Sequence, residues 1–354
     1  MRIRALSEVL PGDPVTNRDL AERFGLHERW LERMTGNRTR YLCRADSPDG
    51  VPKLTGDLAV EAGRRAMDAA AVTPGDLDFL ILTTASPDHL MPSTANLVAD
   101  RLGLNDLPAL QLTSGCAGAV QGLHTARALL ASGAGRGLVI GADTCRKLMP
   151  ESDEAVRALG PAGMVNFAMF GDGAGAAVVE AEGTGPALTT EHLVLRTVGK
   201  GRPPAQVVRW YGVEGAPRVP GPRGALVRES MAEEDYKAIE ANVPGLAAGV
   251  LTELAAAVGW DVPEVEHILT PQLNGVMTER IREHMGVRSD QAVSCVADTG
   301  NNGNALPFIQ LHRAVAPITD DPAADGDRFL LTAIESSKWV VSGMALRWDG
   351  GEPR

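Results

Sequence analysis

Apolar and polar residues follow one another along this chain in the pattern of buried strands that alternate with amphipathic helices. Near-continuous apolar runs, which are typical of strands covered on both faces, predict strands over 78–84, 110–113 and 137–141. Apolar residues at helical spacing predict helices over 17–24, 57–71 and 94–102. This alternation indicates an α/β fold with a largely buried sheet.

The second half of the chain repeats the element order of the first. In the first half, FLILT (79–83) precedes a loop, a helix, a strand, the corner SGCAGA (114–119), another helix and a final strand. In the second half, HILT (267–270) precedes the same series, with TGNNGNA (299–305) at the corner. Such a duplication implies two similar halves related by a pseudo-twofold axis. We therefore expect an N-terminal half over 1–182, a connecting or cap region over 183–260 and a C-terminal half over 261–354.

The first corner carries Cys116, between a predicted strand and a helix that starts at Ala117. A thiol at the start of a helix lies near the positive end of the helix macrodipole, which favours the thiolate. The small residues around it leave room for a carbonyl group to approach the sulfur, and a backbone N–H there can hold an oxyanion. This points to a nucleophile; the alternative is a buried structural cysteine. The duplication brings the second corner, with Asn301 and Asn302, to the same site.

Two other stretches bear on substrate binding. Trp30 precedes a basic stretch, and it either stacks on a nucleotide such as the adenine end of coenzyme A or packs at a solvated helix edge. Residues 183–224 are rich in Gly, Pro and Arg and carry Trp210, which favours a cap on the substrate side.

Glycine and proline mark two further features. The FGDGAG run at 170–175 precedes a strand instead of following one, so it predicts close backbone packing and not a phosphate loop. Residues 229–258 have a helical pattern, which we expect to be broken near Pro244 and Gly245.

The composition narrows the class of protein. The net charge of −11 argues against nucleic acid as a partner. No apolar run approaches the roughly 20 residues that span a membrane. The first residues lack the apolar stretch of a signal peptide, so we expect a cytoplasmic protein. The four cysteines lie far apart, without a CxxC pair or a Cys/His cluster, which predicts neither a disulfide framework nor a metal site.

Together, several of these segments resemble the β-ketoacyl-ACP synthase III family, whose members have the thiolase fold. The matching motifs are WLERMTG near residue 30, MPSTAN at 91–96, LTSGCAGAVQGL at 112–123, MFGDGAGAA at 169–177 and GNNGNA at 300–305. The resemblance implies a five-layered αβαβα sandwich that forms a homodimer. It implies that Cys116 carries the acyl group, that Asn301 is the catalytic asparagine and that Met91 reaches into the partner's acyl pocket. It implies no bound cofactor, since acyl-CoA or the phosphopantetheine of an acyl carrier protein is the substrate.

The sequence departs from the family pattern where the family has its histidine. The family's HQAN motif reads PQLN here, so Pro271 takes the place of the histidine, while Gln272 and Asn274 match later positions. Proline has neither an N–H nor a titratable group, and an amide donates to an oxyanion but is no base near neutral pH. Gln272 and Asn274 are therefore candidate oxyanion donors beside Asn301.

The family's C-terminal glycine triplet, which supplies an oxyanion N–H, is also absent. Glu335 and the two serines after it stand in that region, and Met34 stands where an arginine helps to hold coenzyme A. The candidate substrate-binding residues are Trp30, Met91, Trp210, Ser336 and Ser337.

Three functions follow from this pattern. The first is an acyltransferase of antibiotic or polyketide metabolism, in which Cys116 takes an acyl group from an acyl-ACP or acyl-CoA and a small-molecule acceptor bound in the cap region removes it. The second is a decarboxylating β-ketoacyl-ACP synthase III. The third is a non-catalytic subunit that pairs with an active homologue, although the retained cysteine argues against it. Because the missing histidine removes half of the decarboxylation machinery, we favour the acyltransferase.

Overall fold

The chain folds around two half-sheets that are joined at one edge. This computed structural model describes residues 1–43, 54–150, 153–209, 218–220, 226–228 and 232–351. The strand order is β13-β14-β15-β8-β1-β7-β6-β4-β5, and a short pairing of β1 with β8 joins the halves. The strands of the first half are β1 (Arg2–Val9), β4 (Phe79–Thr84), β5 (Ala109–Thr113), β6 (Arg136–Thr144) and β7 (Asp172–Glu180). Those of the second half are β8 (Ala187–Thr197), β13 (His267–Leu269), β14 (Arg328–Glu335) and β15 (Val340–Asp349).

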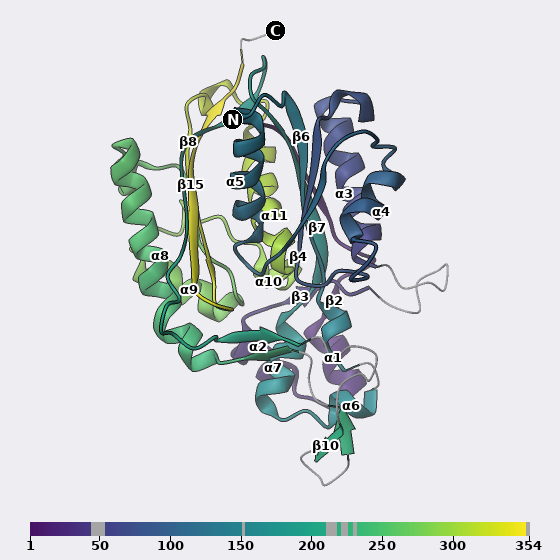
Figure 1. The fold of residues 1–354 in the computed structure, drawn as a ribbon. Coiled ribbons are helices and arrows are strands. Elements are labelled where there is room, and N and C mark those ends of the chain that lie inside the picture. The colour runs from purple at the N-terminus through teal and green to yellow at the C-terminus, as the bar shows by residue number, and fades with distance from the viewer. Residues whose placement is uncertain (44–53, 151–152, 210–217, 221–225, 229–231, 352–354) are drawn as a thin grey trace.

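Helices form three layers around the two half-sheets (Figure 1). The outer face of the first half is covered by α3 (Thr55–Ala70) and α4 (Thr94–Arg101). The outer face of the second half is covered by α8 (Tyr236–Val258) and α9 (Gly275–His284). Between the halves lie α5 (Gly118–Ala131) and α11 (Leu306–Val315), whose apolar side chains join one buried core with both half-sheets. The five-layered αβαβα sandwich predicted from the resemblance is confirmed.

The two halves have the same strand order, as the duplication predicts. The first half runs β5-β4-β6-β7-β1, and the second runs β13-β14-β15-β8. A bridge from Ile268 of β13 to Ala292 stands where β5 stands in the first half. In both halves the inner strands pair in parallel, and the last two pairings are antiparallel. The corners that follow β5 and precede α11 are therefore equivalent in position.

The segment predicted as a cap, 183–260, is only partly a cap. β8 pairs with β15 and β1, so it is a strand of the second half. α8 packs on the same half-sheet, as α3 does on the first. Between β8 and α8 lie two separate two-stranded ribbons. They are β9 (Gln206–Val208) with β12 (Ala232–Glu234) and β10 (Arg218–Pro220) with β11 (Leu226–Arg228). The weak periodicity of the Gly- and Pro-rich region hid the strand from the sequence pattern.

The helix predicted over 229–258 begins only at Tyr236 and passes Pro244 without a break. By length and composition, α8 is the one helix within the described residues that could cross a membrane. Its buried residues, among them Val243, Val250 and Leu254, instead pack with the strands of the second half. The apolar character of α8 thus belongs to the core of the sandwich.

Short helices form a separate apolar cluster beside the sandwich (Figure 1). They are α1 (Asn17–Phe24), α2 (Glu28–Thr35), α6 (Asp153–Arg157) and α7 (Pro161–Met169), with the pair β2 (Val15–Thr16) and β3 (Thr39–Arg40). The last short helix, α10 (Val296–Thr299), precedes the second corner. α1 has the predicted bounds because the Thr16 side chain and Asp19 form a capping box at its start.

The FGDGAG run packs closely against the second corner, as predicted. A Cβ on Gly171 would lie 2.6 Å from the carbonyl oxygen of Thr299, and one on Gly175 would lie 2.5 Å from the Cβ of Phe308. Only glycine permits such an approach of two backbones. These glycines therefore set the distance between β7 and the corner that carries Asn301.

Gly141 in β6 approaches the same corner, and this approach gives a test of the packing. A Cβ on Gly141 would lie 2.1 Å from the carbonyl oxygen of Asn304. We expect Gly141→Ala to lower the free energy of unfolding by about 1–3 kcal/mol or more, because the backbone of Asn304 must shift. Gly249→Ala in α8, where a Cβ meets nothing within 4 Å, is the control and should leave stability unchanged or raise it by up to about 1 kcal/mol. Chemical denaturation measures both, and equal stabilities would contradict the close approach.

Candidate active site

Cys116 lies in the turn between β5 and α5, and groups from both halves hold this turn. The buried carboxylate of Glu335, at the end of β14, accepts the N–H of Gly115 at 3.0 Å and the hydroxyl of Ser114 at 2.7 Å through Oε2. Gln121, in the first turn of α5, donates to the same hydroxyl at 2.8 Å. The position of the thiol is therefore fixed relative to the second half-sheet as well as the first.

Asn301 occupies the equivalent corner of the second half. Its N–H donates to the carbonyl of Met169 at 2.9 Å, and its carbonyl accepts the N–H of Gly171 at 3.0 Å. Its Oδ1 accepts the N–H of Gly303 at 3.1 Å. Its Nδ2 is buried and has no hydrogen-bond partner within the described part of the chain. An unsatisfied buried donor costs about 1–3 kcal/mol, so this amide is free to donate to a substrate oxygen.

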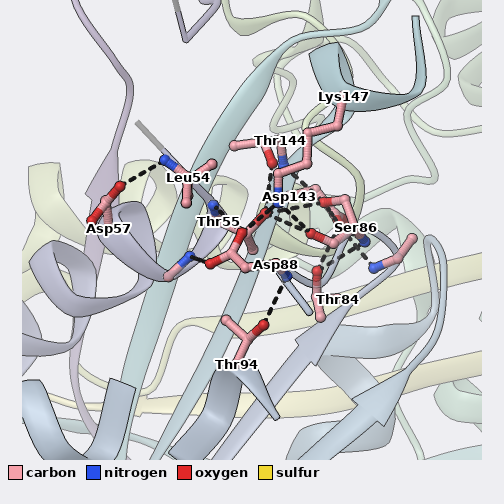
Figure 2. Close-up of polar contacts among 12 residues, drawn as sticks. Leu54, Thr55, Asp57, Thr84, Ser86, Asp88, Thr94, Asp143, Thr144 and Lys147 are labelled. Carbon is pink, nitrogen blue, oxygen red and sulfur yellow. Dashed lines mark hydrogen bonds and ion pairs between the residues drawn. The ribbon is translucent and has the colours of Figure 1, made fainter. Parts of the chain in front are cut away.

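One buried carboxylate links the two corners. Asp143, at the end of β6, accepts both the N–H of Asn304 at 2.8 Å and its side-chain amide at 2.7 Å. The same amide donates to the carbonyl of Ser114 at 2.7 Å. Figure 2 shows the buried network that continues on the other side of Asp143, through Thr84, Ser86, Thr144, Thr55, Asp88 and Lys147.

A cavity lies between the corners. Cys116, Asn301 and Pro271 all line it. Many of its other wall residues are apolar and come from helices of the second half: Ile239, Val243, Met277, Ile281 and Leu306. Such a wall suits an apolar acyl chain. Among the described residues, no histidine lines the cavity and no group of three or more His, Cys, Asp or Glu is placed to hold a metal ion.

The amides of Gln272 and Asn274 have structural partners instead of facing a substrate. Gln272 lines the cavity, but its Oε1 accepts the N–H groups of Cys295 at 3.0 Å and Val296 at 2.8 Å, and its Nε2 donates to a backbone carbonyl at 3.0 Å. Asn274 caps α9, with its Oδ1 accepting the N–H of Met277 at 2.9 Å. Their role as oxyanion donors stays a prediction: in this structure the amide nitrogen of Gln272 donates to the carbonyl of Val293, and that of Asn274 to the sulfur of Met169 at 3.9 Å.

The predicted substrate-binding residues lie in different places. Ser336 lines the cavity, whereas the hydroxyl of Ser337 donates to the carboxylate of Glu335. Met91 is 88% exposed, and Trp30 is half-buried beside the apolar cluster of the short helices. Trp210 lies outside the described residues. Of the four that the structure describes, Ser336 is thus the one that lines the same cavity as Cys116.

Burial and acidic side chains set the ionisation of Cys116, which is half-buried and open on its cavity side. Burial first, and then the charges of Glu335, Glu234 and Asp143, raise the pKa of the thiol to about 12. The helix start still favours a thiolate, but Glu335 places a carboxylate at that same helix start. The prediction of a thiolate-rich cysteine is therefore wrong for the unliganded protein.

A second acidic side chain, Glu234 of the β9/β12 ribbon, lies near enough to Cys116 for its charge to act on the thiol. Glu234 and Gln206 are paired across the ribbon, and Nε2 of Gln206 donates to Oε1 of Glu234 at 2.7 Å. Oε2 of Glu234 is buried without a partner among the residues described here. Burial raises the pKa of Glu234 to about 7, since the charged form loses its hydration. Neither residue is predicted from the sequence, because both lie in the weakly patterned region and only strand pairing brings them together.

Known proteins resemble this chain over its whole length. Residues 110–197 match the family model described as 3-oxoacyl-[acyl-carrier-protein (ACP)] synthase III. A β-ketoacyl-[acyl-carrier-protein] synthase III of Streptomyces coelicolor is 32% identical over 99% of this chain and 98% of its own. The chain belongs to the β-ketoacyl-ACP synthase III family.

Two solved structures are similar to this synthase III family member over almost its whole length. AbyA1, a tetronic acid condensing enzyme, is 43% identical with a TM-score of 0.87, over 98% of this chain and 99% of that one. The 3-oxoacyl-(acyl carrier protein) synthase III of Pseudomonas aeruginosa PAO1 is 25% identical with a TM-score of 0.79, over 99% of both chains. The chain is therefore a divergent member of the family.

The raised pKa of Cys116 predicts how alkylation depends on pH. Because the thiolate is the reactive form and the thiol titrates near 12, the rate of iodoacetamide labelling of Cys116 should rise about tenfold per pH unit between 7 and 10, without a plateau. Glu335→Gln removes a negative charge, so it should lower the thiol pKa and speed labelling at pH 8. Glu233→Gln on the exposed face of β12 is the control. Peptide mass spectrometry measures both rates, and a plateau below pH 9 would contradict this account.

Proposed function

We propose that this family member is a condensing acyltransferase that forms an acyl-enzyme on Cys116 and does not decarboxylate a malonyl thioester. The observation that carries the proposal is the composition of one cavity. Cys116 and the unpartnered amide of Asn301 line it, and Pro271 stands where the family has a histidine. This site retains a nucleophile and one side-chain donor, and it lacks the second donor that an enolate needs.

The first step is transfer of the acyl group to the enzyme. The sulfur of Cys116 attacks the carbonyl carbon of an acyl thioester, a new C–S bond forms, and the carrier leaves as its thiol after taking up the proton that the cysteine loses. The tetrahedral intermediate carries an oxyanion. The Nδ2 of Asn301 and a backbone N–H at the start of α5 are the donors that the proposal assigns to it.

In the second step an acceptor removes the acyl group, and Cys116 regains its proton. The similarity to AbyA1, a tetronic acid condensing enzyme, supports an acceptor that condenses instead of a simple hydrolysis. A tetronic acid ring contains one C–C and one C–O bond that such a condensation can form. A carbon that lies between two carbonyl groups is acidic enough to attack without losing carbon dioxide. Such an acceptor removes the need for the missing histidine.

The family supports the remaining parts of this proposal. The acyl donor is an acyl-ACP or acyl-CoA, no cofactor stays bound, and an acyl carrier protein is the expected partner. The acceptor is a small molecule of secondary metabolism, free or attached to a carrier, and the protein works in the cytoplasm.

A decarboxylating synthase is the second candidate, and the name of the Streptomyces coelicolor relative favours it. It needs two donors for the enolate that forms when a malonyl thioester loses carbon dioxide. Because the amide nitrogens of Gln272 and Asn274 donate to Val293 and Met169, Asn301 remains as the side-chain donor with a free N–H. Losing one oxyanion donor costs about 10²–10³ in rate.

The two candidates differ in loading and in carbon dioxide release. Incubated with hexanoyl-coenzyme A, the wild-type protein should gain one hexanoyl group on Cys116 in intact-protein mass spectra, and Cys116→Ala should gain none. With malonyl-coenzyme A, it should release carbon dioxide about 10²–10³ times more slowly than a synthase that has the histidine. Fast release from the wild-type protein would overturn the acyltransferase proposal in favour of the synthase. Pro271→His should raise the rate of carbon dioxide release. Ala333→Ser, on the same cavity wall, is the control and should leave that rate unchanged.

A homodimer is part of the proposal, and the first half-sheet supports it. β5 is the last strand in the sheet order, so one of its edges has no strand partner in the described chain, and exposed edges are normally covered. Leu90 and Met91 nearby are 67% and 88% exposed. An obligate dimer of this kind buries roughly 2,000 Å² or more.

Light scattering should therefore give twice the chain mass of 37.3 kDa at micromolar concentration. The double change Leu90→Asp with Met91→Asp should weaken the dimer by at least tenfold in dissociation constant, because it buries two charges at the interface. Met34→Asp is the control, because Met34 is also an exposed apolar residue but belongs to α2 and not to the segment before α4. A fully active wild-type monomer would contradict the dimer.

A further inference from the structure

The β9/β12 ribbon is fixed beside the turn that carries Cys116. The N–H of Ala205 donates to the carbonyl of Ser336 at 3.0 Å, and the carbonyl of Ala205 accepts the N–H of Asp235 at 2.7 Å. These two backbone bonds flank the cross-strand pair of Gln206 and Glu234. The pair is thereby tied to the end of β14, beside the residue whose carboxylate holds the Cys116 turn.

Gln206 lies between Glu234 and that turn. Its Nε2 donates to Glu234, and its Oε1 would lie 3.5 Å from a Cβ placed on Gly115. The Cδ of Glu335 would lie 3.4 Å from the same Cβ. Because Gly115 has no side chain, both groups approach the backbone immediately before Cys116. The carboxylate of Glu234 is near enough for its charge to act on the sulfur.

The two acidic side chains differ in their hydrogen bonds. Both oxygens of Glu335 accept bonds, Oε2 from Ser114 and Gly115 and Oε1 from Ser337. Glu234 accepts a bond at Oε1, while its buried Oε2 accepts none from any described residue. A buried carboxylate oxygen without a donor is costly, and taking up a proton relieves that cost. Glu234 therefore has a vacant position for a proton, whereas Glu335 has none.

We propose that Glu234 accepts the proton of Cys116 during acyl transfer and that Gln206 positions it for this task. The inference rests on the proposed acyltransferase function. In the acylation step the thiol proton passes to Oε2 of Glu234 as sulfur bonds to the acyl carbon. The C–S bond to the carrier then breaks, and the proton passes from Glu234 to the leaving sulfur. In the second step the proton of the acceptor follows the same route to the sulfur of Cys116.

The groups around Glu234 set the pH range in which it accepts a proton. Burial raises its pKa to about 7, and the hydrogen bond from Gln206 opposes that rise. The pKa of Tyr236 is raised, by burial and then by the charge of Glu234, so its hydroxyl remains protonated. The pKa of Cys145 is also raised, mainly by burial. The carboxylate of Glu234 is thus the acceptor that becomes available as pH rises through neutrality, well below the titration of either neighbour.

The test is the pH dependence of Cys116 acylation by hexanoyl-coenzyme A and by the small thioester hexanoyl-N-acetylcysteamine. Quenched samples between pH 5.5 and 9 are followed by intact-protein mass spectrometry. The wild-type rate should rise with pH to a midpoint near 7. Glu234→Gln, which keeps the shape and the bond to Gln206, should be about 100-fold slower and should lack that midpoint. Gln206→Leu removes a bond that lowers the pKa of Glu234, so it should move the midpoint to higher pH.

Glu233→Gln is the matched control, because Glu233 lies on the opposite face of the same strand in an ion pair with Arg209. Its acylation profile should equal that of the wild-type protein. Iodoacetamide gives a second readout with the opposite sign: Glu234→Gln removes a negative charge, so Cys116 should be alkylated at least as fast as in the wild-type protein. A wild-type acylation rate and midpoint in Glu234→Gln would overturn this inference alone. A wild-type protein that never loads Cys116 would overturn the proposed function and the inference with it.

Discussion

The active site depends on one buried contact, in which the side-chain amide of Asn304 bonds Ser114 and Asp143 at 2.7 Å each. A buried carboxylate stays in place only when donors replace its lost water, and Asp143 accepts six hydrogen bonds. Asn304 also needs the glycine at the start of α5, since a Cβ on Gly118 would lie 1.7 Å from its Oδ1. The corner with Cys116 and the corner with Asn301 are thus held in one fixed relation.

Because the two corners are fixed in this way, the reactivity of the Cys116 thiol depends on a group that removes its proton. A cysteine at a helix start is expected to ionise easily, but Glu335 occupies the same helix start, and burial removes water from the sulfur. The thiol therefore stays protonated until something takes its proton.

The sequence predicted the two similar halves because a duplication constrains every element twice, whereas the five layers were implied by the resemblance to the family. Equivalent strands, corners and helices recur in both halves, so the equivalence of the Cys116 and Asn301 corners followed from spacing. The prediction failed for groups that depend on distant partners. No residue next to Cys116 in the sequence indicates that Glu335 accepts a hydrogen bond from its turn. Likewise, no residue next to Gln272 indicates that Cys295 donates to its amide oxygen. The strand β8 was missed because Gly and Pro around it hide its pattern, and Glu234 was missed because only pairing with Gln206 brings it to the site.

The change from histidine to Pro271 separates two tasks that one residue performs in the family. An imidazole can both donate to an oxyanion and carry a proton near neutral pH. The free amide of Asn301 is available for donation, but an amide neither takes up nor releases a proton at that pH. Each acyl transfer still moves one proton, and a thiol with a pKa of about 12 does not release it unaided. An acceptor on a segment outside the duplicated sandwich leaves the packing of its layers unchanged. The β9/β12 ribbon between β8 and α8 is such a segment, and the acceptor proposed above is its residue Glu234, whose pKa is raised by burial to about 7.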